Sequence, residues 1–274
     1  MKTFAIFLYA VLLVVCSYGK EVTYTGSTPA AAVVRKFLDI PLEDSVDFIR
    51  WKINISGQHY TLQCSYGLGQ PNTNGFINGG SKITVNGSLQ KEHNFFLLSN
   101  GHKKLKLAVL NENLLHILNP DDSFLIGNGG WSYTLNNIQP EHSKHINFIQ
   151  DCTTVKDSMV FEGRTPCGVP GIIEPGASCY KLKWYIVLYG NTKKNTATTY
   201  KVFGTAWREK GGRKGKWQLI NTNDGRTIYR LNDETGNGLL YLLGVQENIL
   251  LFTDAEGKIL TGNEDFSFTL NRIL

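Results

Sequence analysis

Short runs in which apolar and polar residues alternate fill most of the chain. In residues 49–55 every second side chain is large and apolar, and residues 182–188 repeat this arrangement. A period of two predicts strands that bury one face. The predicted strands are 22–29, 48–55, 60–64, 82–89, 95–98, 105–110, 114–118 and 131–136, then 160–166, 182–188, 200–207, 217–220, 228–231, 239–243, 249–253 and 266–271.

One stretch departs from this pattern. Residues 30–38 carry apolar side chains at helical spacing, at Val33, Val34, Phe37 and Leu38. This spacing predicts a short helix, which Pro41 would end.

The second half of the chain repeats the first. Residues 248–273 align with residues 113–138 at a constant offset of 135, with ten identities in 26 positions. We therefore expect two copies of one unit, at 20–138 and 157–274, joined by a polar linker at 139–156.

About eight short strands joined in order by hairpins form a meander, which has two unpaired edges unless it closes. Closure into a small barrel removes both edges. The predicted fold class is therefore all-β: two tandem, small antiparallel up-and-down barrels with one short helix in the first. Side chains would fill such a barrel or leave room for one small ligand.

The first nineteen residues have the pattern of a secretory signal peptide. Lys2 precedes an apolar run at 4–16, and small residues, Ser17 and Gly19, close it. The run is too short to span a bilayer comfortably. In an alternative interpretation Cys16 is lipidated and anchors the protein to a membrane, although Val15 is a poor residue to precede a lipidated cysteine.

Charge gives a limited indication of partners. The net charge is +5, and the basic residues cluster only in 208–216, among glycines. This stretch is either a receptor for anions or a solvated hairpin loop, and we favour the loop. No aromatic residues alternate with the basic ones as binding to single-stranded nucleic acid would require, so we expect no nucleic-acid partner.

Four cysteines follow the signal peptide, at Cys64, Cys152, Cys167 and Cys179. In an exported chain they permit two disulfides in three pairings. The loop between Cys167 and Cys179 is rich in glycine and proline, which favours that bridge and leaves Cys64–Cys152 by elimination. In the alternative, Cys167 and Cys179 stay reduced and bind a metal.

Other candidate residues have a structural and a functional interpretation. Trp51 and Trp184, on matching strands, are either core residues, which we favour, or residues that stack on a ligand. His142 and His145 lie in the predicted linker, where exposure to water is favoured over metal binding. No catalytic signature occurs, so catalytic residues are not expected.

The second unit resembles the N-terminal domain of NlpE-type copper-resistance lipoproteins. The resemblance rests on Phe-Glu-Gly-Arg-Thr-Pro-Cys at 161–167, Tyr-Lys-Val-Phe-Gly-Thr at 200–205, Gly-Lys-Trp at 215–217 and Asp-Ala-Glu-Gly at 254–257. It implies a lipocalin-like barrel in the bacterial envelope, and the whole chain also resembles exported tandem proteins of Bacteroidota-type bacteria. The family has a Cys-x-x-Cys motif. Cys167 matches its first cysteine, but Pro170 stands at the position of the second. Copper binding is therefore implied only by the resemblance.

These observations predict a non-enzymatic exported protein of the periplasm or cell surface, which binds a small ligand or an envelope protein, or senses envelope or copper stress. A thiol-dependent metal-binding protein and a structural or adhesive surface protein are the alternatives. Only lipidation at Cys16 would attach it to a membrane.

Overall fold

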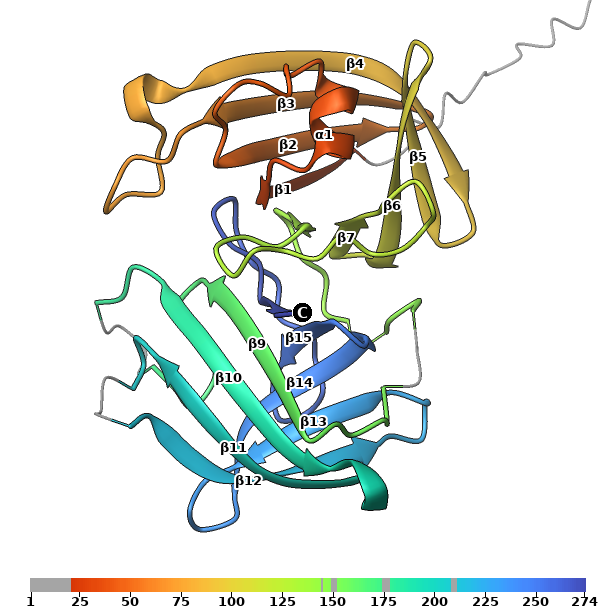
Figure 1. The fold of residues 1–274 in the computed structure, drawn as a ribbon. Helices are drawn as coiled ribbons and strands as arrows, with labels where there is room; N and C mark the ends of the chain where they lie inside the picture. The colour runs from red at the N-terminus through yellow and green to blue at the C-terminus, as the bar shows by residue number, and fades with distance from the viewer. Residues whose placement is uncertain (1–20, 144, 149–151, 174–177, 208–210) are drawn as a thin grey trace, which may run out of the picture.

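The computed structural model describes residues 21–143, 145–148, 152–173, 178–207 and 211–274. They form two closed eight-stranded antiparallel barrels in tandem, stacked one on the other (Figure 1). The fold class predicted from the alternating pattern is therefore confirmed. The predicted signal peptide and Cys16 lie outside the described residues.

Barrel 1 contains strands β1–β8 in sequence order around the cylinder. It closes where β1 pairs with β8, with Tyr24 opposite Asn137 and Thr25 opposite Asn136. Its elements are β1 (Val22–Pro29), α1 (Ala32–Leu38), β2 (Phe48–Ser56), β3 (His59–Gly67), η1 (Ile77–Gly79), β4 (Ser81–Glu92), β5 (Phe95–Asn100), β6 (Lys103–Asn111), β7 (Leu114–Ile117) and β8 (Thr134–Asn137).

Barrel 2 contains β9–β16 and closes in the same way, where β9 pairs with β16 and Glu162 lies opposite Asn271. Its elements are β9 (Ser158–Thr165), β10 (Leu182–Asn191), η2 (Thr192–Lys194), β11 (Thr196–Gly204), β12 (Arg213–Asn221), β13 (Thr227–Asn232), β14 (Gly238–Gln246), β15 (Ile249–Thr253) and β16 (Thr269–Arg272).

Large apolar side chains fill the interior of each barrel. Every second residue of β2 points inward, and Trp51 and Ile53 are completely buried. In barrel 2, Trp184, Ile186 and Tyr200 belong to the corresponding core cluster. Because the side chains occupy the interior, a ligand site has to be sought at the rims or on the outside of the barrels.

Different segments cap the equivalent end of the two barrels, each between its first and second strand. In barrel 1 the predicted helix forms, beginning at Ala32, and places Phe37 and Leu38 in the core cluster. In barrel 2 the segment between β9 and β10 contributes Val169 to the core cluster, and the partly buried Ile172 packs against it. The Cys167–Cys179 disulfide joins the two ends of this segment.

The connection between the barrels is less detached than its polar sequence suggests. Ile146 is buried in an apolar cluster between the barrels, and Cys152 and Val155 belong to the core of barrel 2.

The strand expected from Trp131 starts only at Thr134, because the Asn128 side chain accepts hydrogen bonds from the backbone of Gly130 and Trp131 and so forms a turn.

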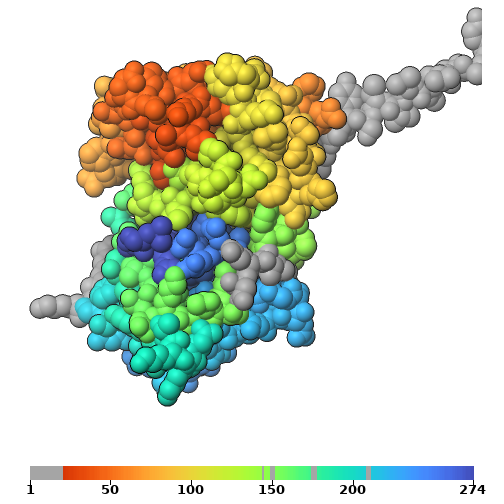
Figure 2. All heavy atoms as spheres, turned by 45° about the vertical axis from the view of Figure 1, so that its right-hand side comes forward, coloured from red at the N-terminus to blue at the C-terminus, as the bar shows by residue number. Residues whose placement is uncertain are grey.

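The outer faces of β5–β7 and β13–β15 meet in a third apolar cluster. Ala108, Leu110 and Leu118 from barrel 1 pack there with residues of barrel 2 such as Leu243 and Val245. Figure 2 shows the two parts of the chain in direct contact at this level. Among the described residues, no helix is long and apolar enough to span a bilayer.

Candidate functional site

The two tryptophans considered as ligand contacts lie inside the barrels. The Trp51 Nε1 donates a hydrogen bond of 2.9 Å to Thr28 Oγ1, and the Trp184 Nε1 donates one of the same length to Thr165 Oγ1. Both indoles are buried and have their one polar atom satisfied within the core. Their geometry is that of core residues, with no polar atom left to offer a ligand.

The cysteines follow one of the two predicted pairings. Cys167 and Cys179 form a disulfide with their Cα atoms 6.0 Å apart, so they present no thiolate pair to a metal. The predicted Cys64–Cys152 bridge is wrong: Cys64 belongs to the core of barrel 1 and Cys152 to the core of barrel 2. Burial raises the pKa of the Cys64 thiol far above its usual value.

The two linker histidines lie at the surface. His142 and His145 are exposed, and the His145 Nε2 lies 2.8 Å from Asn147 Oδ1. Within the described residues no three side chains of histidine, cysteine, aspartate or glutamate are grouped so that they could hold a metal ion.

A pocket of about 650 Å³ opens at one rim of barrel 2. It lies between β11, the first half of β12 and the turn that joins β13 to β14. β12 pairs with β13 only from Trp217 onward, so the regular ladder between the two strands ends beside the pocket. The lining residues are Tyr189, Thr199, Tyr200, Lys201, Lys214, Gly215, Lys216, Asn232, Asp233, Glu234, Thr235 and Gly236.

A tyrosine that lies over a glycine supports the floor of this pocket. Tyr200 is opposite Gly215 in the register of β11 and β12, and its hydroxyl donates a 2.8 Å hydrogen bond to the Asn232 carbonyl. A Cβ at Gly215 would lie 2.7 Å from the tyrosine ring. Only glycine lets the ring cross the strand and reach the next one.

Barrel 1 has the same arrangement of a tyrosine over a glycine. Tyr60 lies opposite Gly87 and donates to the Ser99 carbonyl at 3.3 Å. The two tyrosine and glycine pairs therefore fix which residues of the two barrels correspond around the pocket.

Three lysines and two acidic residues, Asp233 and Glu234, line the barrel 2 pocket. Lys201 lies directly opposite Lys214, and Lys216 is opposite Thr199. They alternate with inward-pointing neighbours such as Tyr200 and so lie on the outer face. None of the ion pairs between described residues involves these lysines.

The corresponding surface of barrel 1 is neutral. Thr61 lies opposite Asn86 where barrel 2 has Lys201 opposite Lys214, and the Thr61 hydroxyl donates a 2.8 Å hydrogen bond to Asn86 Oδ1. Like charges directly opposite each other on neighbouring strands destabilise a sheet. Barrel 2 thus has an unfavourable pair at a position where barrel 1 has a favourable one.

A longer hairpin forms the outer wall of the pocket. Leu231 pairs with Leu240, nine positions later, whereas Leu98 pairs with Leu105, seven positions later. The barrel 2 hairpin is therefore two residues longer. Asp233 holds its turn, because its carboxylate accepts hydrogen bonds from Thr235 and Asn237. These hydrogen bonds, first of all the one from the Thr235 side chain, hold the pKa of Asp233 below its usual value.

Sequence reasoning favoured a solvated loop for the basic stretch that lines the pocket. The structure places Arg213–Lys216 in β12, while residues 208–210 lie outside the described residues. The alternation of Lys214, Gly215, Lys216 and Trp217 was a signal for a strand with an outer basic face. This pattern identifies a basic surface only when the neighbouring strand, β11, is known.

Comparisons with known proteins gave no match to this chain among family models, curated proteins or solved structures.

Proposed function

We propose that this is a non-enzymatic exported binding protein, in which the barrel 2 pocket holds a small organic anion and barrel 1 is the rigid support. The proposal extends the expectation of a tandem-barrel envelope protein that binds a ligand or senses stress. Its place in the periplasm or at the cell surface depends on the predicted signal peptide and, for membrane attachment, on Cys16.

One observation carries the proposal: the facing pair of Lys201 and Lys214 in the wall of the pocket at the rim of barrel 2. Such a pair costs about 0.2–1 kcal/mol relative to a neutral one, and a bound anion would turn the repulsion into attraction. Barrel 1, built on the same plan, has the neutral Thr61 and Asn86 at these positions.

The other lining residues define the rest of the ligand. The lysine stems are apolar below their charged ends, and Tyr189 adds an aromatic side chain. On the acidic side of the pocket, the Asp233 carboxylate already accepts hydrogen bonds from the backbone of its own turn. A carboxylate, sulfate or phosphate group attached to an apolar body fits this lining best.

Fluorescence titration with 1-anilinonaphthalene-8-sulfonate, a small aromatic sulfonate, tests the proposal. We expect saturable binding that the triple variant Lys201→Gln, Lys214→Gln, Lys216→Gln weakens at least about tenfold, which corresponds to about 1.4 kcal/mol. Binding should also weaken as salt is raised.

A matched control removes the same number of charges from the outside of barrel 1, with Lys52→Gln, Lys82→Gln and Lys104→Gln, which are all exposed. This control should bind the probe as the natural protein does. Equal affinities for all three proteins would show that the pocket is not the binding site.

A further inference from the structure

The two barrels meet through residues that occupy the same position in the two sequence copies. Ser132 Oγ lies 2.6 Å from Ser267 Oγ, and the Thr269 hydroxyl donates a 3.1 Å hydrogen bond to Thr134 Oγ1. Both pairs are separated by 135 residues, which is the offset of the repeat. A residue that contacts its own counterpart lies on a twofold axis.

Contacts away from this axis are reciprocal. The Gly262 amide donates to Asn136 Oδ1 at 2.8 Å, and the Gly127 amide donates to Asn271 Oδ1 at 2.8 Å. Exchanging each residue for its counterpart, 135 positions away, turns one contact into the other. The same exchange of roles is the signature of an interface between two identical subunits.

The apolar part of the interface obeys the same rule. Three pairs of counterparts, each 135 apart, all belong to the cluster between the barrels. They are Ala108 and Leu243, Leu110 and Val245, and Phe124 and Ile259. Each barrel therefore presents a self-complementary surface made of polar loops and an apolar strand face.

We infer that this surface recognises a second copy of the unit, so that two chains can exchange barrels: barrel 1 of one chain packs on barrel 2 of the other. The interface is intramolecular only because residues 138–157 join the two barrels in one chain. Twenty residues, 138–157, separate β8 from β9. Fully extended they would reach roughly 65 Å, a length that requires Ile146, Cys152 and Val155 to leave their contacts with the barrels. Exchange of identical elements between chains costs little when the interface itself is unchanged.

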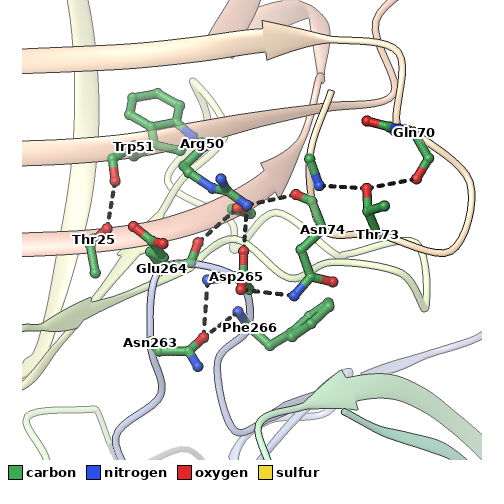
Figure 3. A network of polar contacts seen from close by, with 12 residues as sticks. Thr25, Arg50, Trp51, Gln70, Thr73, Asn74, Asn263, Glu264, Asp265 and Phe266 are labelled. Carbon is green, nitrogen blue, oxygen red and sulfur yellow. Dashed lines mark hydrogen bonds and ion pairs between the residues drawn. The ribbon is translucent and has the colours of Figure 1, made fainter. Parts of the chain in front are cut away.

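Among the contacts that break the twofold symmetry, an ion pair between the barrels can be tested directly. The Arg50 guanidinium pairs with the Asp265 carboxylate, which also accepts a 2.8 Å hydrogen bond from the Asn74 amide (Figure 3). The counterpart of Asp265 in barrel 1 is Gly130, so the interface contains this ion pair in one copy.

Charge reversal at this pair tests the exchange. In Arg50→Asp and in Asp265→Arg, like charges face each other within one chain and also between two copies of the same variant. In a mixture, barrel 1 of the first variant meets barrel 2 of the second with the introduced aspartate opposite the introduced arginine, and the remaining two barrels restore the natural pair. The two variants are unfolded together in urea, refolded and analysed by native mass spectrometry.

We expect a heterodimer in the mixture at least about fivefold more abundant than the dimer of either variant refolded alone. The double variant Arg50→Asp, Asp265→Arg, which restores opposite charges within one chain, should be monomeric. A mixture that stays monomeric, or dimers of equal abundance in all samples, would overturn the inference.

A second measurement does not depend on charge. Ser132→Cys and Ser267→Cys chains are mixed, refolded and oxidised, because a disulfide at this position can then form only between chains. We expect a disulfide-linked dimer that joins the two variants, and its absence from correctly folded protein would count against exchange.

Discussion

The two barrels have the same strand order, the same closure and the same tyrosine and glycine contact, yet they differ in the segment that caps them, at an outer surface and at a buried position. Barrel 1 has the neutral Thr61 and Asn86 where barrel 2 has Lys201 and Lys214. Barrel 1 also buries His116 at the position that is Leu251 in barrel 2. The comparison separates residues that form the barrel, which are alike, from residues that give one copy a property of its own.

The largest effect is expected where the barrels are alike. Trp51→Ala and Trp184→Ala should each lower the free energy of unfolding by about 3–5 kcal/mol, because each deletes a buried indole. Urea unfolding followed by circular dichroism measures this. Trp51→Ala should leave binding of the anilinonaphthalene sulfonate unchanged. Loss of probe binding in Trp184→Ala protein that is still folded would make that residue a ligand contact.

A smaller effect concerns His116. Its Nε2 lies 2.9 Å from the Leu125 carbonyl and its Nδ1 lies 3.0 Å from Thr134 Oγ1. Because a carbonyl only accepts, the neutral ring donates from Nε2 and accepts from Thr134. Burial lowers the pKa of His116 from its usual 6.5 to about 4.

Acidification should therefore weaken the fold. Between pH 6.5 and 4 the unfolded chain binds a proton that the folded chain excludes, so stability is full above pH 6.5 and falls with pH, by about 3 kcal/mol at pH 4. The variant His116→Leu, which copies Leu251 of barrel 2, should not show this loss of stability at low pH. The difference between the pH profiles of the two proteins, measured by urea unfolding, isolates it from the titration of carboxylates.

The smallest effect sharpens the comparison of the outer surfaces. Thr61→Lys with Asn86→Lys should destabilise barrel 1 by about 0.2–1 kcal/mol, since it replaces a hydrogen bond with facing like charges. Thermal unfolding measures the loss. These changes alone should add no second site for the sulfonate probe, because the hairpin of barrel 1 lacks the two residues that wall the pocket. Stoichiometric binding of two probes would show that charge alone makes the site.

Much of the fold could be predicted from the chain. The alternation at 49–55 and 182–188, the repeat offset of 135 and the turn residues lead to two closed barrels. The turns between Cys167 and Cys179 indicated the disulfide that forms. Elimination failed for Cys64 and Cys152, because counting cysteines ignores that each lies on an inward position of a different core.

The candidate pocket could not be predicted, because it depends on which residues face each other. Lys201 and Lys214 are distant in sequence, and only the register of β11 and β12 puts them side by side. The interface, in contrast, coincides with a sequence pattern. Ser132 and Ser267 are identical between the two copies, as are Thr134 and Thr269, and each pair forms a contact between the barrels.

The self-complementary surface also has a consequence during synthesis. Barrel 1 can close once Asn137 has been synthesised. The face that carries Ala108 and Phe124 then remains exposed to water until barrel 2 is complete. During that interval a neighbouring nascent chain offers the same face. Crowding of newly made copies therefore competes with correct pairing inside each molecule, and dilution or a slower rate of production should favour the monomer.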